Sequence, residues 1–443
     1  MCYAIPGKIK EIDGKTVVVD YFGQEKRAIN EFYDLGVGDY VSAQGGFVIK
    51  KVSPAEAEET LLAWKELFFE LQDMDLRLSG INLNQKNIDK GLRLILDKAL
   101  ENIPLVKKDL LYLLSLDRQQ DKELFFKAAN FLRQKYHQNA CCVHGIIEIS
   151  NFCNQSCQYC GIAASNRNLS RYRMSVTEVV EAAVEAVEKY GFQALILQSG
   201  EDSDYKLDDL VGIIEQVKNR CPVLIGVSFG EVGLDGLDRL YKAGARALLM
   251  RFESSNPEIF AKVHPGRTLD SRLAHIRKAR DLGFIIMTGS LIGLPGQTRE
   301  DIVNDIYLTK ALGAEMYSFG PFLPHPDTPL AGCLPSNQEE VLKTLALIRF
   351  IDPETAKILV TTAFETLSSQ ARRLGLLSGA NSVMLNVTPL KYRRHYAIYP
   401  DKADIYSEIN DQIRETIDLL KSLGRAPTDL GISSDLVNNH EKK

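Results

Sequence analysis

The chain of 443 residues lacks any apolar run that reaches the ~18 residues of a membrane-spanning helix. Its start, MCYAIPGKIK, lacks the charged segment followed by an apolar segment that marks a signal peptide. The formal net charge is -5, with no large block of one sign, and phosphate binding needs clustered Lys and Arg. We therefore expect a cytoplasmic protein that binds neither membranes nor nucleic acids.

Disulfides are not indicated either. In a long chain without a secretion signal, clustered cysteines indicate metal ligands. Three of the eight cysteines, Cys153, Cys157 and Cys160, fall within eight residues, and there is no second C-x-x-C grouping to indicate an auxiliary cluster. The other five are Cys2, Cys141, Cys142, Cys221 and Cys333.

From residue 144 onward, short apolar strand candidates alternate with helical stretches such as 176–191 and 270–283. Eight βα units in succession predict a complete (β/α)8 (TIM) barrel of the α/β class. The active site of such a barrel lies at the carboxyl ends of its strands. The strand candidates are residues 145–150, 194–199, 223–229, 247–252, 285–293, 316–320, 358–363 and 382–386.

The first part of the chain has a different residue pattern. TVVVDYF at 16–22 is rich in β-branched and aromatic residues, and glycines separate short runs, as in a small β-barrel. Ser53-Pro54 and the spacing that follows predict a helix over 55–78. We expect a small β-barrel domain with a C-terminal helix over 1–75, a linker and helical extension over 76–140, the large barrel over 141–430 and a frayed tail over 431–443.

The clustered cysteines have the spacing C-x3-C-x2-C directly after the first barrel strand. Three thiolates without a fourth suit a 4Fe-4S cluster with one open iron. The spacing resembles the signature of radical S-adenosylmethionine (SAM) enzymes, whose open iron binds SAM, and Tyr159 before the last cysteine fits that pattern. The alternative is a zinc site with His144 as the nearest fourth ligand, although zinc sites more often use C-x2-C pairs.

A wider resemblance surrounds this loop. HGIIEISNFCNQSCQYCGI (144–162), LQSGED (197–202), SFGE (228–231) and GPFLPHPDTPLA (320–331) are similar to the FeFe-hydrogenase maturase HydE family. The similarity runs from about residue 86 to 428. It implies a radical SAM barrel that forms a 5′-deoxyadenosyl radical. Biotin synthase and methylornithine synthase are relatives of this family.

The resemblance also implies contacts to SAM. Glu231 and Arg251 resemble a pair that binds its polar groups, because a carboxylate can meet the ammonium and an arginine can fork onto the carboxylate. A salt bridge between these two residues at the barrel mouth is the alternative. The cofactor-binding residues implied are Tyr159, Ser199, Gly200, Glu201, Glu231, Arg251, Gly293 and Leu294.

The family further implies a substrate cavity, although Met and Tyr near barrel ends also serve in packing. Its lining residues here are Thr361, Thr362, Met384, Tyr396 and Tyr399. Two positions depart from the family. Phe252 replaces a histidine and removes a polar donor close to SAM, and Leu385 replaces a proline and removes a stiff turn. Both departures concern the identity of the substrate rather than the radical chemistry.

Residues 1 to about 70 resemble the HypC/HupF chaperone family of NiFe-hydrogenase maturation, through MCYAIPGKI (1–9) and VGDYVSAQGGFVIKKVSPAEAEE (37–59). The resemblance implies that the initiator Met is removed and that Cys2 ligates an iron carrying CO and cyanide, for which a thiolate beside an α-amine is suitable. The family's histidine ligand is replaced by Gln44. An inert terminal thiol is the alternative. We expect Cys2 to approach the mouth of the large barrel.

These features predict a maturase that processes an organometallic Fe(CO)(CN)-cysteine-type precursor, with the small domain as carrier of the iron unit. Hydrogenase maturation proteins and an electron donor, ferredoxin or flavodoxin, are the implied partners. One alternative is a radical SAM enzyme acting on a small organic or amino-acid substrate, like methylornithine synthase or biotin synthase. The other is a non-catalytic scaffold for iron units.

Overall fold

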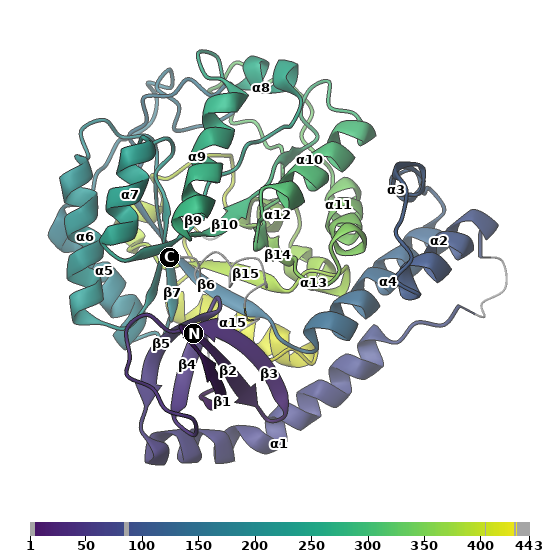
Figure 1. Cartoon of the computed structure of the whole chain (residues 1–443). Helices are drawn as coiled ribbons and strands as arrows, with labels where there is room; N and C mark the ends of the chain where they lie inside the picture. Colours follow the sequence, from purple (N-terminus) through teal and green to yellow (C-terminus); the bar gives the residue numbers. More distant parts are fainter. Residues whose placement is uncertain (1–4, 84–87, 404, 429–430, 432–443) are drawn as a thin grey trace.

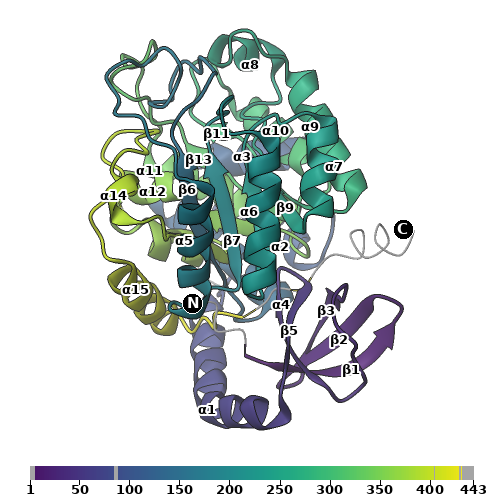
Figure 2. The ribbon, with the colours of Figure 1, turned by 90° about the vertical axis from the view of Figure 1, so that its left-hand side faces the viewer.

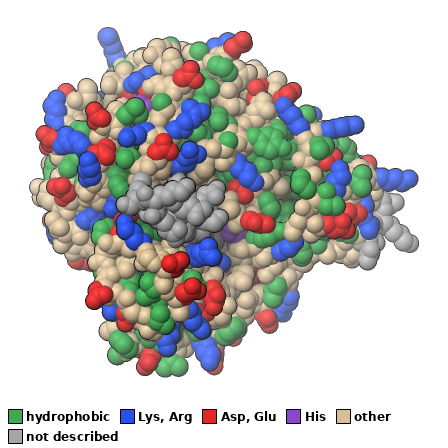
Figure 3. Space-filling model, in the orientation of Figure 1, with side chains coloured by type: hydrophobic (Ala, Val, Ile, Leu, Met, Phe, Trp, Pro, Cys, Tyr) green, Lys and Arg blue, Asp and Glu red, His purple; other side chains and the backbone are tan. Residues whose placement is uncertain are grey.

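The computed structural model describes residues 5–83, 88–403, 405–428 and 431, and it contains two closed β-barrels (Figure 1). Side chains of both charge signs are interspersed over the face shown in Figure 3. No helix in the described ranges is long and apolar enough to span a membrane. Cys2 and the tail from residue 432 lie outside the described residues.

The small barrel has the strand order β1-β2-β3-β5-β4, which confirms the β-barrel predicted for the first segment. Alternation places Val17, Val19 and Tyr21 of one strand in its core, together with Ile9 and Val41. Its strands are β1 (Gly7–Asp13), β2 (Thr16–Tyr21), β3 (Gln24–Ile29), β4 (Tyr40–Gln44) and β5 (Phe47–Val52).

A helical segment connects the two barrels. It begins with α1 (Pro54–Ser79), whose N-cap Ser53 accepts a hydrogen bond from the amide of Glu56. The Arg133 guanidinium binds both carboxylate oxygens of Asp75 at 2.7 Å, and neither side chain is exposed by more than 1%. This bidentate pair ties the end of the first helix to the last helix of the segment. The other helices are α2 (Lys90–Leu100), α3 (Lys107–Leu114) and α4 (Gln119–His137).

The large barrel closes in the order β10-β12-β14-β15-β6-β7-β8-β9, and all of its strand pairs are parallel. Each of the eight strand candidates overlaps one of these strands, so the predicted (β/α)8 fold is confirmed. The strands are β6 (Cys142–Ser150), β7 (Ala194–Ser199), β8 (Leu224–Ser228), β9 (Ala245–Leu249), β10 (Ile285–Thr288), β12 (Met316–Tyr317), β14 (Lys357–Val360) and β15 (Ser382–Asn386).

The candidates 285–293 and 316–320 each contain a short barrel strand and a second short strand outside the barrel wall. In 285–293 the chain leaves the wall at Gly289, where a Cβ atom would lie 2.4 Å from the carbonyl oxygen of Ser318, so only glycine permits the close approach. Beyond it, β11 (Leu291–Ile292) and β13 (Gly320–Pro321) form a separate two-stranded sheet.

Helices cover the outside of the large barrel (Figures 1 and 2). They are α5 (Val176–Glu188), α6 (Leu207–Arg220), α7 (Leu234–Lys242), α8 (Pro257–Val263), α9 (Leu269–Leu282), α10 (Arg299–Ala311), α11 (Gln338–Ile351), α12 (Thr362–Leu367), α13 (Ala371–Leu377), α14 (Leu390–Arg393) and α15 (Ile409–Ser422).

The small barrel packs against the amino ends of the large barrel's strands (Figures 1 and 2). Phe47 belongs to one apolar cluster with Leu224 and Ile285 from the inside of the large barrel. At the rim, the Arg246 guanidinium pairs with the carboxylate of Glu31 at 2.6 Å, and both side chains are about nine-tenths buried. Without the small barrel, this apolar end of the large barrel would be exposed to solvent. The two barrels therefore form one structural unit.

This arrangement bears on the expected approach of Cys2 to the barrel mouth. The mouth is at the carboxyl ends of the strands, whereas the small barrel lies at their amino ends. Cys2 itself lies outside the described residues, so its expected approach to the mouth stays a prediction. The position of the small barrel follows from packing that covers one end of the barrel axis, on which no sequence motif reports.

We expect Gly45→Leu to weaken this junction. A Cβ atom at Gly45 would lie 2.8 Å from Leu224 Cδ2 and 3.3 Å from Ile285 Cδ1. Overpacking of this kind costs about 1–3 kcal/mol in the free energy of unfolding. The matched control is Gly14→Leu, whose φ of +55° is close to the +59° of Gly45 but whose Cβ atom would meet no described atom within 4 Å. Urea unfolding should show the larger loss for Gly45→Leu, and equal losses would contradict the packing described.

Candidate functional site

The three clustered cysteines converge on one cavity at the carboxyl ends of the barrel strands. The cavity has a volume of about 260 Å³, and Cys153, Cys157 and Cys160 contribute to its lining. All three are partly buried thiols. The structure therefore brings together the residues that the spacing predicted as cluster ligands.

The loop that carries the cysteines is held by a guanidinium group that the sequence reasoning missed. Arg171 donates hydrogen bonds to the carbonyl oxygens of Asn151, Ile162, Ala163 and Asn166. These carbonyls lie on both sides of the three cysteines in the chain. One side chain thus fixes the path of the whole loop before any ligand binds.

A second restraint acts next to Cys160. A Cβ atom at Gly161 would lie 2.0 Å from the carbonyl oxygen of Ala397 and 2.5 Å from His325 Cδ2. Only glycine permits the loop to pass so close to these two segments. The loop is therefore clamped from the C-terminal side of the barrel as well.

The cysteine thiols lie in surroundings that favour their protonated form. Burial, with smaller contributions from the neighbouring Cys153 and Glu253, raises the pKa of Cys160 to about 12, and burial also raises the pKa of Cys157. Cys157 Sγ lies 3.2 Å from Nδ1 of His264, a residue that the sequence reasoning did not single out.

The zinc alternative finds no support in this geometry. His144, its nearest candidate ligand, is buried in β6, and its ring nitrogens have no hydrogen-bond partner among the described residues. Within the same ranges, no three His, Cys, Asp or Glu side chains are arranged to hold a single metal ion.

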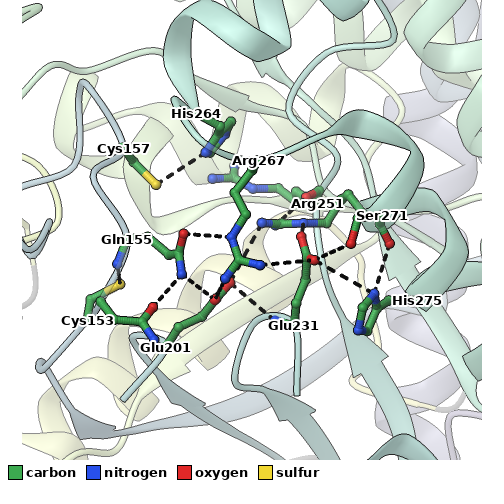
Figure 4. A network of polar contacts seen from close by, with 12 residues as sticks. Cys153, Gln155, Cys157, Glu201, Glu231, Arg251, His264, Arg267, Ser271 and His275 are labelled. Atoms are coloured by element: carbon green, nitrogen blue, oxygen red, sulfur yellow. Dashed lines mark hydrogen bonds and ion pairs between the residues drawn. The ribbon is translucent and has the colours of Figure 1, made fainter. Parts of the chain in front are cut away.

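Two carboxylates and two guanidinium groups gather beside the cysteine loop (Figure 4). Glu231 accepts hydrogen bonds from Arg272 Nε at 2.9 Å and from Ser271 Oγ at 2.6 Å. Glu201 pairs with Arg267, and it lies 3.8 Å from Arg272. The Glu231 side chain is only 2% exposed, whereas Arg267 is 29% exposed, so the network is buried at Glu231 and reaches solvent at Arg267.

Glu231 and Arg251, which were expected to bind the polar groups of SAM, are not paired with each other. Arg251 lines the cysteine cavity, its Nε lies 3.3 Å from the carboxylate of Glu253, and its carbonyl oxygen accepts from Arg272 at 3.2 Å. The alternative of a Glu231–Arg251 salt bridge is therefore not what the structure shows, and the contacts of the two residues with SAM stay a prediction.

The network can receive an amino acid group. Burial works against ionisation of Glu231, but the hydrogen bonds from Ser271 and Arg272 hold its pKa below the usual value. A carboxylate of a ligand can be met by Arg272 or Arg267, and an ammonium by a glutamate. Both arginines come after β9, near the start of α9. Because the active site lies at the carboxyl ends of the strands, cationic residues after a barrel strand are a sequence signal that could have identified them.

Gly200 lies directly against the cysteine loop. A Cβ atom there would lie 2.3 Å from the carbonyl oxygen of Phe152 and 2.7 Å from Cys153 Cβ. Ser199 lines the cavity, and its hydroxyl donates to the Gly200 carbonyl at 2.7 Å. The Ser-Gly-Glu segment that the sequence singled out is therefore at the site.

The remaining cofactor candidates are placed differently. Tyr159 lines the cavity and packs edge-on against His264. Gly293 and Leu294 form a turn whose amides donate to Gln297 Oε1 at 2.7 and 3.2 Å. These two residues do not line the cavity; Leu294 belongs to an apolar cluster that Tyr159 packs against.

Four of the five predicted substrate residues line the same cavity, namely Thr361, Thr362, Met384 and Tyr399. Thr362 Oγ1 and Tyr399 Oη are hydrogen-bonded at 2.8 Å. Tyr396 is buried behind the lining, and its hydroxyl accepts from Gln198 Nε2 at 3.0 Å. It therefore positions a lining residue instead of lining the cavity itself.

The two departures from the family point away from the cavity. Phe252 and Leu385 are buried in the apolar core between the barrel and its helices, and neither lines the cavity. Phe252 therefore does not remove a polar donor from the cavity wall, contrary to the expectation.

A buried ion pair at the cavity was not predicted. Glu148 pairs with Lys402, and both side chains are at most 3% exposed. Asn386 Nδ2 donates to the same carboxylate at 3.0 Å. The sequence shows Glu148 as a charged residue inside the first strand. Its partner Lys402 comes from a loop more than 250 positions away, so only the fold brings the two together.

We expect Gly200→Ala to disturb the cluster loop, because the added Cβ atom would displace backbone rather than a flexible side chain. A shift of about 1 Å in a reacting group can lower a rate by about 100-fold. The measurements are iron and sulfide per chain after reconstitution and the rate of SAM cleavage. The control is Gly212→Ala in α6, where the nearest atom lies 3.9 Å away. Full cluster content and full rate in Gly200→Ala would contradict the close approach.

The thiol pKa values make cluster loading pH-dependent. Metal ligation requires thiolates, so protons leave when the cluster binds. With raised pKa values the thiols stay protonated near pH 8, and we expect release of about three protons per chain in a weakly buffered titration. Because the pKa of Cys160 is raised from 9.0 to about 12, the apoprotein should also lose stability as the pH rises from 9 towards 12. Fewer than one proton released would show that the thiols are already ionised.

The sequence matches three family descriptions along its length. Residues 1–64 match the HupF/HypC family, 147–307 the Radical SAM superfamily, and 318–426 the Biotin and Thiamin Synthesis associated domain. Membership of the radical SAM superfamily implies a 4Fe-4S cluster and SAM as cofactors. The first match covers the small barrel and the start of α1, and the other two cover the large barrel.

Known proteins are similar over most of the chain. The [FeFe] hydrogenase maturase subunit HydE of Thermotoga maritima is 37% identical over 335 residues, which is 76% of this chain and 95% of that protein. The 3-methylornithine synthase of Methanosarcina acetivorans is 27% identical over 75% of this chain and 93% of that protein.

Solved structures share the fold. A methylornithine synthase structure (PylB) superposes with a TM-score of 0.67 at 24% identity, covering 76% of this chain and 98% of that one. The FeFe-hydrogenase maturase HydG from Carboxydothermus hydrogenoformans gives 0.64 at 21% identity, covering 82% and 84%. With the cysteine cavity, the match to HydE identifies the enzyme class: the chain belongs to the HydE family of radical SAM hydrogenase maturases and carries a HupF/HypC-type domain at its N-terminus.

Proposed function

We propose that this enzyme uses the radical formed from SAM to process an iron complex that carries CO, cyanide and a cysteine sulfur, as a step in hydrogenase cofactor assembly. The observation that carries the proposal is the union, in one chain, of a HydE-type cysteine cavity and a HupF/HypC-type barrel. Both kinds of module belong to hydrogenase maturation, and the two pack through a shared apolar core.

Cys153, Cys157 and Cys160 are the proposed ligands of the cluster. The fit is supported by the convergence of three thiols on one cavity and by the close approach that Gly200 allows between the SAM side and the cysteine loop. When bound, the cluster supplies the electron that cleaves SAM to methionine and a 5′-deoxyadenosyl radical.

The chain's own residues then orient the cofactor and shield it. Arg272 and Arg267 are placed to bind a carboxylate, and Glu201 to bind an ammonium. The hydrogen bond between Gln155 Nε2 and Glu201 at 2.8 Å links this group to the cysteine loop. Binding in these surroundings limits the water and stray hydrogen donors that a radical would attack.

The substrate is proposed to lie deeper in the cavity, near Thr361, Thr362 and Tyr399. These hydroxyls can donate to the nitrogen of cyanide or to a carboxylate, and Met384 offers an apolar wall beside them. Cys2 is proposed to carry an iron unit in the small domain, with Gln44 in place of a histidine ligand. A thiolate is a ligand that iron accepts.

A second candidate function is supported by one specific observation. The buried pair of Glu148 and Lys402 at the cavity could bind the ammonium and carboxylate of an amino acid, and 3-methylornithine synthase is among the relatives. In that case the substrate would be a small amino acid. A non-catalytic scaffold is not proposed, because the chain belongs to a family of radical SAM enzymes.

The deciding experiment is anaerobic turnover of the reconstituted enzyme with dithionite, SAM and a synthetic Fe(CO)2(CN)-cysteine complex. We expect the complex to stimulate formation of 5′-deoxyadenosine. Mass spectrometry measures this product and any adenosyl adduct. Cys157→Ala should abolish the reaction. Cleavage that ignores the complex but responds to an amino acid would replace the proposal with the second candidate.

Cys2→Ala is the matched variant for the carrier role. SAM cleavage should be unchanged when the complex is present in solution during turnover. It should be lower when turnover depends on complex that the protein has taken up beforehand. Deletion of residues 1–75 is a poorer test, because it removes Asp75 and leaves the Arg133 guanidinium buried without its carboxylate.

A further inference from the structure

A histidine side chain contacts one of the three proposed cluster ligands (Figure 4). Nδ1 of His264 lies 3.2 Å from Sγ of Cys157. Nε2 of the same ring lies 3.5 Å from the hydroxyl oxygen of Tyr159. His264 lines the cavity and is buried, yet the proposed chemistry gives it no role.

The ring of His264 is fixed from several directions. It packs against Phe260 with the ring centroids 4.8 Å apart, and it meets the Tyr159 ring edge-on at 5.8 Å. The backbone is fixed as well, because the amide of Gln158 in the cysteine loop donates to the carbonyl oxygen of Val263 at 3.0 Å. The interactions that attach the end of α8 to the cysteine loop therefore also hold the imidazole against the sulfur.

The surroundings of this contact are apolar. Tyr159 packs against an apolar cluster to which two residues of α8, Ile259 and Val263, belong. His264, which caps the same helix, is 5% exposed. A hydrogen bond is electrostatically stronger in such surroundings than in water, so a donor at this position acts on the sulfur with little screening.

Ligation decides which partner donates in this contact. A thiol that binds iron loses its proton, so Sγ of Cys157 can then only accept a hydrogen bond. The proton must therefore be on Nδ1 of His264, and Nε2 keeps a lone pair that can accept from the Tyr159 hydroxyl. The groups around the ring thus suit the tautomer that the ligated state requires.

The other two sulfurs receive hydrogen bonds from the backbone. The amide of Gln155 donates to Sγ of Cys153 at 3.5 Å, and the amide of Ile162 donates to the sulfur of Cys160. These two bonds follow from the path of the loop, whatever side chains it carries. The bond from His264 depends on one side chain, so a substitution can remove it and leave the backbone donors in place.

We propose that His264 is a positioning residue of the cluster site, whose Nδ1–H hydrogen bond to Cys157 raises the reduction potential of the bound cluster. A donor against a ligating sulfur stabilises the negative charge that reduction adds, and hydrogen bonds to the sulfurs are among the factors that set the potential of iron–sulfur clusters. A higher potential allows a weaker electron donor to reduce the cluster. The inference rests on the proposed ligation by Cys157 and is independent of the substrate.

The test is a redox titration of the reconstituted full-length enzyme without SAM, in which electron paramagnetic resonance measures the reduced cluster. At a given solution potential, we expect His264→Leu to lower the ratio of reduced to oxidised cluster about tenfold, which corresponds to about 59 mV for one electron. His264→Gln should recover most of the ratio, because its amide also donates. Equal ratios in the wild type and His264→Leu would overturn the proposal and leave the ring a packing role.

A matched control makes the same exchange at another buried histidine. His144 lies within β6, and its ring nitrogens have no hydrogen-bond partner among the described residues. His144→Leu should therefore keep the wild-type ratio, and a fall equal to that of His264→Leu would overturn the assignment to the sulfur contact. Iron and sulfide per chain are measured for every variant, so that only fully loaded clusters are compared.

A second measurement does not depend on how the variants fold. In wild-type enzyme whose histidines carry the heavy nitrogen isotope, pulsed electron paramagnetic resonance should show coupling of a histidine nitrogen to the reduced cluster. His264→Leu should lose this coupling. Its absence from the loaded wild-type enzyme would overturn the proposal.

The role of His264 and the ligation by Cys157 fail separately. If Cys157→Ala keeps a complete cluster, the proposed ligation falls and the role of His264 falls with it. If Cys157→Ala loses the cluster while His264→Leu keeps the wild-type potential, the ligation stands and only the role of His264 falls.

Discussion

The parallel pairing of β15 with β6 closes the large barrel, and both ends of the molecule depend on it. Residues 382–386 pair in register with 142–146, although nearly the whole barrel separates them in the chain. This closure points His144 and Met384 into one axis and brings the cysteine loop after β6 to the same edge as Thr361 after β14. An open sheet would leave these groups far apart.

At the carboxyl end, the site is built from charges that are paired before any ligand arrives. Glu231 is held by Arg272 and Ser271, and Glu201 by Arg267 and Gln155. A zwitterionic ligand can exchange into such a network without leaving a buried charge alone, which would be costly. The same network is hydrogen-bonded to the cysteine loop, so cofactor binding and loop geometry are mechanically connected.

At the amino end, the small barrel covers the axis of the large barrel with an apolar surface. Phe47 and Ile49 fill this junction, and Gln44, whose register partner is Phe47, is fully buried. The small barrel therefore closes the end of the large barrel that lies opposite the cysteine cavity.

The sequence by itself determined the local features. The eight apolar runs predicted the barrel, the C-x3-C-x2-C spacing predicted the cysteine loop, and the β-branched runs before Ser53 predicted the small barrel. These signals are periodicities or short spacings, so they survive in a single sequence. Motif resemblance added Gly200, Glu201 and the four substrate candidates that line the cavity.

Only the tertiary structure decided which distant residues meet. It placed Arg272 beside Glu231, paired Glu148 with Lys402, and put the small barrel at the amino ends of the large barrel's strands. These contacts join segments tens to hundreds of residues apart, and their energy comes from burial and charge pairing in the folded state. A linear pattern does not encode such contacts, because any of several arginines or lysines could satisfy the same carboxylate until the barrel closes.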